Sequence, residues 1–185
     1  PVAGEVFKEG TYEIESERRG YALELAVDFV RMEYTRHRFW EKDDTPVVPL
    51  KSQTLEDVIG TWPQGKINVR IGDYMFRPHQ KWTITAVPNG GGYLGGPYYK
   101  IVIEGTNRAL AATADAEVVT VPEFTGTPEQ LWRIDQLTDG TYRIMPKEVP
   151  GTDKELVLVS VGDSTPSLGE FDMNSDNSKW NFRDH

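Results

Sequence analysis

The sequence contains no cysteine in its 185 residues. Disulfide bonds, thiolate nucleophiles and cysteine-ligated metals are therefore excluded. Secreted β-proteins of this size often carry disulfides. The N-terminal residues 1–5 also lack the basic and apolar regions of a signal peptide. Both absences lead us to expect a cytoplasmic protein, while secretion followed by removal of a signal peptide stays an open alternative.

The chain also lacks long apolar runs and an excess of positive charge. No stretch approaches the roughly 18 consecutive apolar residues that a membrane-spanning helix needs, so we expect no membrane insertion. The 20 Lys and Arg residues are outnumbered by 29 Asp and Glu residues, for a formal net charge of -9. Such a surface repels polyanions, and we therefore expect no nucleic-acid partner.

Recognisable catalytic motifs are missing as well. The three histidines, His37, His79 and His185, are scattered along the chain. No His-Glu-x-x-His, Gly-x-Ser-x-Gly or phosphate-binding loop occurs. The sequence therefore predicts a protein that is not an enzyme and has no cofactor and no metal site.

Three of the five tryptophans recur at a nearly constant interval. Trp82, Trp132 and Trp180 are 50 and 48 residues apart, and each opens a short β-like run. The tripeptides that end on them are Gln-Lys-Trp, Gln-Leu-Trp and Ser-Lys-Trp. A Tyr-led strand follows the first two of these tryptophans, and a similar phrase, Gly-Thr-Tyr-Glu-Ile, occupies residues 10–14. A period of this length indicates a repeat architecture.

Three similar units predict an all-β fold. Short alternating strands separated by turn residues are typical of barrels and sandwiches. One unit cannot cover its own apolar face, whereas three units can close a barrel and leave no exposed sheet edges. We therefore predict one domain over residues 1–185 with pseudo-threefold symmetry, and with units at about 8–85, 86–135 and 136–185.

The first unit is longer than the other two. Its Tyr12 and Trp82 are 70 residues apart, whereas Tyr99 and Trp132 are 33 residues apart. The sequence thus predicts an insertion within residues 28–77. Long structured insertions usually serve as a binding loop, a dimer contact or a lid, so a homodimer is one of the outcomes that we keep open.

These repeats resemble the ricin-B-type β-trefoil family and its Gln-x-Trp signature. Within that family the sequence is most similar to the cysteine-free fungal lectins, through its Gly-Thr-Tyr-x-Ile opening and its Asp-Asn-x-Lys-Trp segment at 176–180. The resemblance covers nearly the whole chain except the insertion. It implies a β-trefoil that binds carbohydrate without catalysis and has glycans or glycoproteins as partners.

The resemblance also implies a type of sugar site. In the family, an acidic side chain after a unit's first strand combines with an aromatic ring and with an amide three residues before the closing Trp. A carboxylate accepts from vicinal hydroxyls, an amide donates and accepts, and a ring covers the apolar face of a pyranose. The third unit comes nearest, with Asp153, Phe171 and Asn177. Ser178 replaces the family's Gln there, and Asn177 as a simple turn residue is the alternative interpretation.

A second sugar site is conceivable in the first unit. His79 stands there in the place of the amide, and Asp28, Tyr34 and Trp40 are its candidate partners. The second unit has Glu129 in that place, so we interpret this unit as structural.

Protease inhibition is the alternative function. Cysteine-free fungal trefoils also include inhibitors of serine and cysteine proteases, which present a rigid loop to the protease cleft. A basic side chain on an exposed loop could fill a trypsin-like acidic pocket. Arg18 and Arg19, between the first two predicted strands, are the best candidates for this inhibitory loop. A protease would then be the partner.

Overall fold

The computed structural model describes residues 7–18, 21–27, 55–88, 90–93, 96–162 and 164–184. Its elements follow one another in this order: β1 (Gly10–Ser16), β2 (Ala22–Leu25), α1 (Leu55–Ile59), β3 (Ile67–Gly72), η1 (Pro78–Gln80), β4 (Trp82–Ala86), β5 (Gly92–Tyr93), β6 (Gly96–Pro97), β7 (Tyr99–Ile103), β8 (Ala109–Ala112), β9 (Val118–Val121), η2 (Pro128–Gln130), β10 (Trp132–Gln136), β11 (Tyr142–Pro146), β12 (Val157–Val161), β13 (Thr165–Gly169), η3 (Asp176–Ser178) and β14 (Trp180–Asp184). None of the helices in these ranges is long and apolar enough to cross a membrane.

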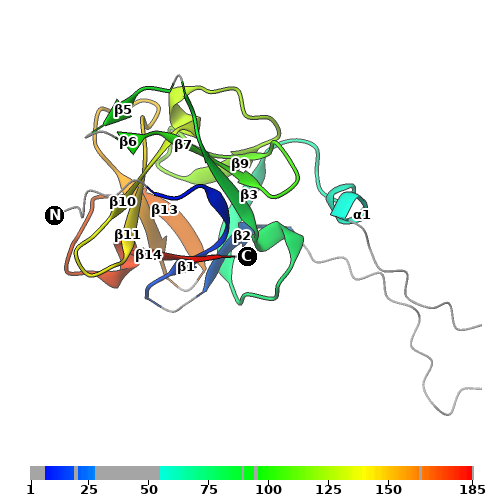
Figure 1. Cartoon of the computed structure of the whole chain (residues 1–185), viewed down its shortest axis with the longest axis horizontal. Helices are drawn as coiled ribbons and strands as arrows, with labels where there is room; N and C mark the ends of the chain where they lie inside the picture. Colours follow the sequence, from blue (N-terminus) through cyan, green and yellow to red (C-terminus); the bar gives the residue numbers. More distant parts are fainter. Residues whose placement is uncertain are drawn as a thin grey trace, which may run out of the picture.

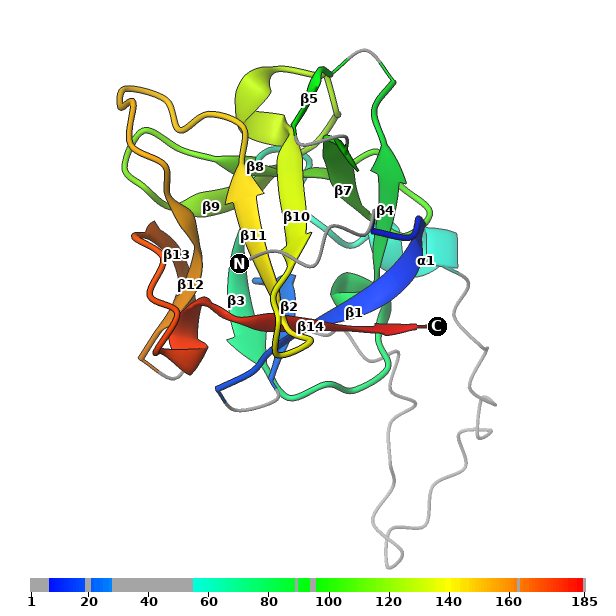
Figure 2. The same ribbon diagram turned by 60° about the vertical axis from the view of Figure 1, so that its left-hand side comes forward.

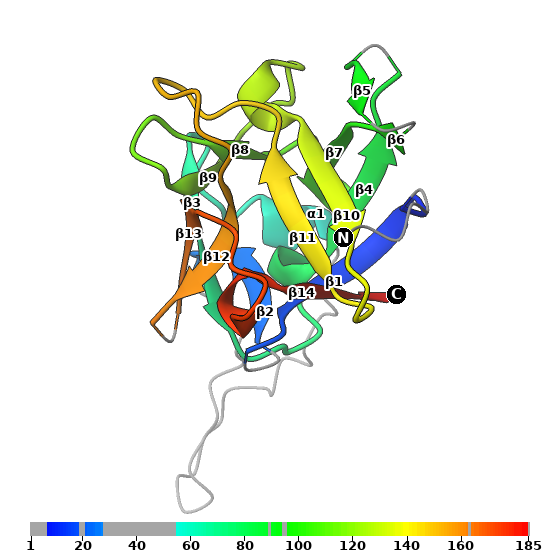
Figure 3. The ribbon, with the colours of Figure 1, turned by 90° about the vertical axis from the view of Figure 1, so that its left-hand side faces the viewer.

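Six strands close into a barrel. Antiparallel pairs run from β1 to β4, β7, β10, β11 and β14, and β14 pairs with β1 again. The hairpins β2–β3, β8–β9 and β12–β13 complete the three four-stranded units. Figure 1 shows the barrel with these hairpins around it, and Figures 2 and 3 show β10 and β11 side by side in its wall. The predicted all-β trefoil is confirmed.

The three repeated tryptophans occupy equivalent places. Trp82, Trp132 and Trp180 have no exposed surface, and each is the first residue of its unit's fourth strand. Each indole Nε1 donates a hydrogen bond to a leucine carbonyl in the second strand of the same unit. The acceptors are Leu23 at 2.9 Å, Leu110 at 2.8 Å and Leu158 at 2.9 Å. A buried donor and a buried acceptor satisfy each other in this way three times.

The aromatic ring of Phe7 joins the three units at one point. Its centroid lies 5.1 Å from Tyr12, 5.8 Å from Tyr99 and 5.6 Å from Tyr142. These tyrosines hold the same place in the first strand of each unit, so Phe7 packs close to the pseudo-threefold axis. The Tyr99 hydroxyl also donates to the Phe7 carbonyl at 2.8 Å. Edge-to-face packing of this kind adds to the burial energy of the rings.

The extra length of the first unit lies between β2 and β3, over residues 26–66, of which residues 28–54 are outside the described part of the chain. The described end of this stretch is tied to the second unit. Arg108 donates to the carbonyls of Gly65 at 2.8 Å and Pro63 at 2.9 Å. Trp62 is buried against the core. The chain therefore re-enters the barrel at a fixed point.

The buried indoles predict a large loss of stability on truncation. Trp132→Ala should lower the free energy of unfolding by about 3–5 kcal/mol, because a buried ring is removed. Trp132→Phe keeps a ring but leaves the Leu110 carbonyl without its donor, and should cost about 1–3 kcal/mol. Chemical denaturation measures both variants. Met173→Ala, at an exposed position, is the control and should stay within about 0.5 kcal/mol of the original protein. A Trp132→Ala loss no larger than that of the control would contradict the packing described above.

Candidate functional site

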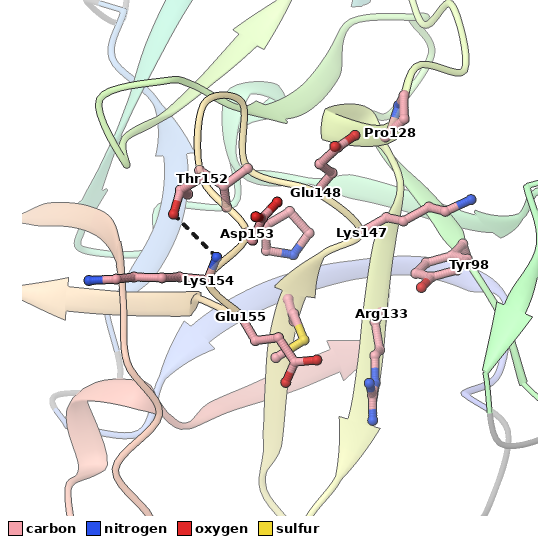
Figure 4. Close-up of a pocket in the computed structure, with 12 residues that line it drawn as sticks. Tyr98, Pro128, Arg133, Lys147, Glu148, Thr152, Asp153, Lys154 and Glu155 are labelled. Atoms are coloured by element: carbon pink, nitrogen blue, oxygen red, sulfur yellow. Dashed lines mark hydrogen bonds between the residues drawn. The ribbon is translucent and has the colours of Figure 1, made fainter.

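A pocket of about 440 Å³ lies where the second and third units meet (Figure 4). Tyr98, Pro128 and Arg133 line it from the second unit. The chain from the end of β11 to the start of β12 lines it from the third unit and includes Lys147 and Asp153. The pocket therefore depends on the contact between two units and belongs to neither alone.

Lys147 fixes the side of the pocket that faces Tyr98. Its backbone N–H donates to the Leu131 carbonyl at 2.8 Å, which ties the start of the β11–β12 loop to the end of η2. Its Nζ donates to the Gly90 carbonyl at 2.8 Å and lies 5.1 Å from the centroid of the Tyr98 ring. A cation over a ring in this range is attracted by the ring's quadrupole. Lys147 thus joins three separate loops.

The side chain of Arg133 is held by the carboxylate of Asp135. The Nε atoms of Arg133 and Arg143 both donate to Oδ2 of Asp135 at 2.9 Å. The Asp135 side chain is almost fully buried, and a buried charge needs such partners. The same Arg133 side chain lines the pocket.

The loop from β11 to β12 carries three carboxylates into the pocket lining, those of Glu148, Asp153 and Glu155. A short bridge between Val149 and Thr152 shapes this loop, and the Lys154 N–H donates to the Thr152 hydroxyl at 3.2 Å (Figure 4). Arg133, Lys147 and Lys154 supply three basic side chains to the same lining. The lining is therefore rich in both acceptors and donors and nearly balanced in charge.

Phe171 lies in a different, smaller pocket. This pocket has a volume of about 120 Å³ and is also lined by Asp139, Met173 and Lys179. The guanidinium carbon of Arg143 lies 5.4 Å from the centroid of the Phe171 ring. Lys179 Nζ donates to Asp139 at 3.0 Å, which ties the β13–β14 loop to the β10–β11 turn.

Asn177 belongs to neither of these two pockets. It lies in η3, where its N–H donates to the Ser175 hydroxyl at 3.2 Å and its carbonyl accepts from the Ser160 hydroxyl at 3.4 Å. The expectation that Asp153, Phe171 and Asn177 line one pocket is therefore wrong. The contacts of Phe171 explain this, since its ring packs on Arg143 and its pocket is closed by the Lys179–Asp139 ion pair, apart from the β11–β12 loop that carries Asp153.

Asp139 is an ionised and fully engaged carboxylate. The Thr141 hydroxyl donates to it at 2.5 Å and the Thr141 N–H at 2.9 Å, and Lys179 adds an ion pair. The Thr141 side chain first, then its backbone and Lys179, lower the pKa of Asp139 to about 2. Asp139 therefore keeps its charge throughout the physiological range.

In the first unit, His79 is part of the buried core and is not a surface ligand. Its Nε2 lies 3.5 Å from Glu24, which also accepts from Arg70 at 2.7 Å and Gln80 at 2.8 Å. Burial alone would raise the pKa of Glu24, but the hydrogen bonds from His79, Arg70 and Gln80 lower it. The structure therefore does not support His79 as a sugar ligand. Its expected partners, Asp28, Tyr34 and Trp40, lie outside the described residues.

The Arg18 side chain is exposed but already makes a hydrogen bond within the protein. Its Nη1 donates to the Gly162 carbonyl at 2.5 Å, which holds the side chain against the turn between β12 and β13. Arg19 lies outside the described residues. Within the described part of the chain, no three His, Asp or Glu side chains come together as a metal site would require.

Glu13, in the middle of β1, is a buried carboxylate without a hydrogen-bond partner for either oxygen. Burial, together with the neighbouring Glu15, raises the pKa of Glu13 from 4.5 to about 7, although Arg183 opposes this shift. The folded protein therefore binds a proton that the unfolded chain has already lost. The contribution of Glu13 to stability is fully present below pH 4.5 and is lost as the pH rises through about 7.

The shift at Glu13 predicts a pH-dependent stability. The melting temperature should fall between pH 5 and pH 8, since the carboxylate must ionise in a buried place. Glu13→Gln, which is neutral at every pH, should flatten this decline and melt no lower than the original protein at pH 8. Glu117→Gln removes an exposed carboxylate and serves as the control. Parallel melting curves for the original protein and Glu13→Gln across this pH range would show that Glu13 does not titrate as described.

Known proteins resemble the chain in sequence and in fold. The model of the family described as "Ricin-type beta-trefoil lectin domain-like" matches residues 78–167. No curated protein matches the sequence. The predicted resemblance to ricin-B-type β-trefoils is confirmed by this match and by the fold.

Three solved structures illustrate the similarity of fold. A mosquitocidal holotoxin is 14% identical over 97% of this chain, with a TM-score of 0.64, and the chain spans only 18% of its length. The designed threefold-symmetric protein ThreeFoil is 19% identical, with 95% of this chain and 99% of that one covered and a TM-score of 0.62. The Polyporus squamosus lectin, solved with a human-type influenza-binding epitope, is 15% identical over 97% of this chain and 50% of its own, with a TM-score of 0.61.

Proposed function

We propose that the protein binds carbohydrate without catalysis, and that the pocket at the junction of the second and third units is the site. One observation carries this proposal. In a chain that matches a lectin-type family model, one pocket is lined by the carboxylates of Glu148, Asp153 and Glu155 together with Arg133 and Tyr98. Glycans or glycoproteins are the partners that fit this lining.

The chemistry of the lining suits a polyhydroxylated ligand. A carboxylate can accept from two vicinal hydroxyls at once, and a guanidinium can donate to two oxygens with fixed geometry. Charges of both signs line the pocket, so a neutral sugar meets both donors and acceptors. The volume of about 440 Å³ falls within the roughly 300–1,000 Å³ that is usual for small-ligand sites.

We retain Asp153 as a proposed sugar-binding residue, because it lines this pocket. Phe171 and Asn177 lie elsewhere, so we assign the ring contact to Tyr98 and give Asn177 no direct part in this pocket. Protease inhibition through Arg18 and Arg19 receives no comparable support, because the Arg18 side chain already binds the Gly162 carbonyl.

Affinity for a single sugar should be modest. Hydrogen bonds to a sugar replace hydrogen bonds to water, and each contributes only about 0.5–1.5 kcal/mol net, or about 1.5–3 kcal/mol where one partner is charged. A few such bonds, after the cost of association, support dissociation constants from roughly micromolar to millimolar. Tight attachment to a glycoprotein would then require more than one contact.

Substitutions in the β11–β12 loop test this site. Asp153→Asn and Glu148→Gln keep the shape of the side chain but remove the charge, and each should weaken binding by about tenfold, as the loss of one charge-assisted hydrogen bond implies. A glycan array first identifies a ligand, and calorimetric titration with that ligand then measures the variants. Asp115→Asn in the β8–β9 turn is the matched control, and Asn177→Ala should also bind normally.

Three results would contradict the proposal in different ways. Unchanged affinity in both Asp153→Asn and Glu148→Gln would move the site away from this pocket. A silent glycan array would reject carbohydrate binding for the glycans displayed. Inhibition of trypsin or papain at micromolar protein concentration would favour the inhibitor alternative.

A further inference from the structure

The loop between β3 and η1, residues 73–77, presents two large apolar side chains to solvent. Phe76 is 72% exposed and Met75 is 47% exposed. The backbone of Phe76 has a φ of 56°, in the left-handed region. A bulky residue rarely adopts this conformation, because it is strained, and it persists only where the surroundings enforce it.

The second unit makes the same turn without this cost. Six residues before its closing Trp stands Gly126 with a φ of 84°, the place that Phe76 holds before Trp82. In both units the Gln two residues before the Trp organises the turn. Gln80 Oε1 accepts from the Met75 N–H at 2.8 Å, as Gln130 Oε1 accepts from the Thr125 N–H at 2.7 Å. Glycine is thus the unstrained solution to this turn, and the first unit has phenylalanine instead.

The core holds the strained turn in place. Gln80 is fully buried, and its Nε2 donates to the Asp73 carbonyl at 2.7 Å and to Glu24 at 2.8 Å. Glu24 is itself fixed by Arg70 at 2.7 Å. On the outer side, the rings of Tyr74 and Phe76 pack with their centroids 4.6 Å apart. Phe76 is therefore a preorganised ring that packs on another ring and yet remains largely open to solvent.

We propose that Phe76 is a second carbohydrate contact, on which the apolar C–H face of one sugar ring stacks beside Met75. This inference rests on the carbohydrate-binding function proposed above. Aromatic rings supply large apolar contact area with little loss of side-chain entropy, and a preorganised ring reduces the cost of binding further. Asp73, exposed in the same loop, offers a carboxylate acceptor for hydroxyl groups.

The size of the apolar surface favours a sugar over a protein partner. Among the described residues, the other large apolar side chains that are strongly exposed are Val161 and Met173, both in the third unit. The apolar surface at the loop is thus two side chains wide, the scale of a single sugar ring. A stable protein interface buries about 800 Å² on each partner, over about 20–30 residues.

The Phe76→Gly variant distinguishes the effect of this residue on stability from its effect on glycan binding. This variant should melt at the same temperature or about 2–4 °C higher, because glycine adopts the turn without strain. Its avidity for an immobilised multivalent glycoprotein should fall by about tenfold or more, because one of two contacts is lost. Phe76→Asn should lose avidity in the same way, because asparagine also adopts a positive φ but has no ring. Phe76→Trp keeps an aromatic ring and should therefore bind like the original protein. Val161→Ala is the control and should bind normally.

The outcomes separate the two proposals. Full avidity of Phe76→Gly and Phe76→Asn, together with loss of binding in Asp153→Asn, would overturn the contact at Phe76 and leave the junction pocket standing. Reduced avidity in Phe76→Gly and Phe76→Asn, together with normal avidity in Phe76→Trp, supports the contact. Reduced avidity in Phe76→Trp as well would overturn ring stacking at this position. An original protein that binds no glycan would overturn the proposed function, and the inference with it.

Discussion

The hydrogen bond from each closing indole to a leucine carbonyl is the interaction on which the architecture depends. It connects the first residue of a unit's fourth strand to the chain at its second strand, and so joins the barrel to the hairpin beside it. Both groups are fully buried and would otherwise lack partners, at a cost of about 1–3 kcal/mol for each group. Three such bonds around the axis fix the relative positions of barrel, hairpins and loops.

This constraint explains why the fold was predictable and the site was not. The tryptophans, the Tyr-led strands and their spacing repeat because each unit solves the same packing problem, so three copies of the signal stand in the sequence. The junction pocket has no such signal. It forms only when Tyr98 and Arg133 of the second unit meet Lys147 and Asp153 of the third. His79 shows the opposite error, since its position suggested a ligand although its side chain is buried in an ion network.

The departures from symmetry fall on equivalent positions, which shows where the units have diverged. Lys100, Arg143 and Glu13 each follow the repeated tyrosine of their unit's first strand. Lys100 lies over the Phe124 ring at 5.5 Å and Arg143 over the Phe171 ring at 5.4 Å. Glu13 is an acidic residue at the same position, and its carboxyl oxygens are buried without a hydrogen-bond partner. A cation that packs on a ring stabilises a loop, whereas a buried lone carboxylate makes the same position sensitive to pH.

The two proposed contacts also differ in how the rest of the structure stabilises their side chains. The junction pocket uses side chains that are satisfied by neighbours, as Arg133 is by Asp135 and Lys147 by the Gly90 carbonyl. The Phe76 loop instead holds a strained residue against a rigid, hydrogen-bonded base. Because the base is anchored to the barrel through Gln80 and Glu24, the spacing between both contacts is fixed. A rigid bivalent protein gains avidity only on glycans whose sugar rings match that spacing, so the geometry of the receptor, more than the chemistry of one sugar, would determine its specificity.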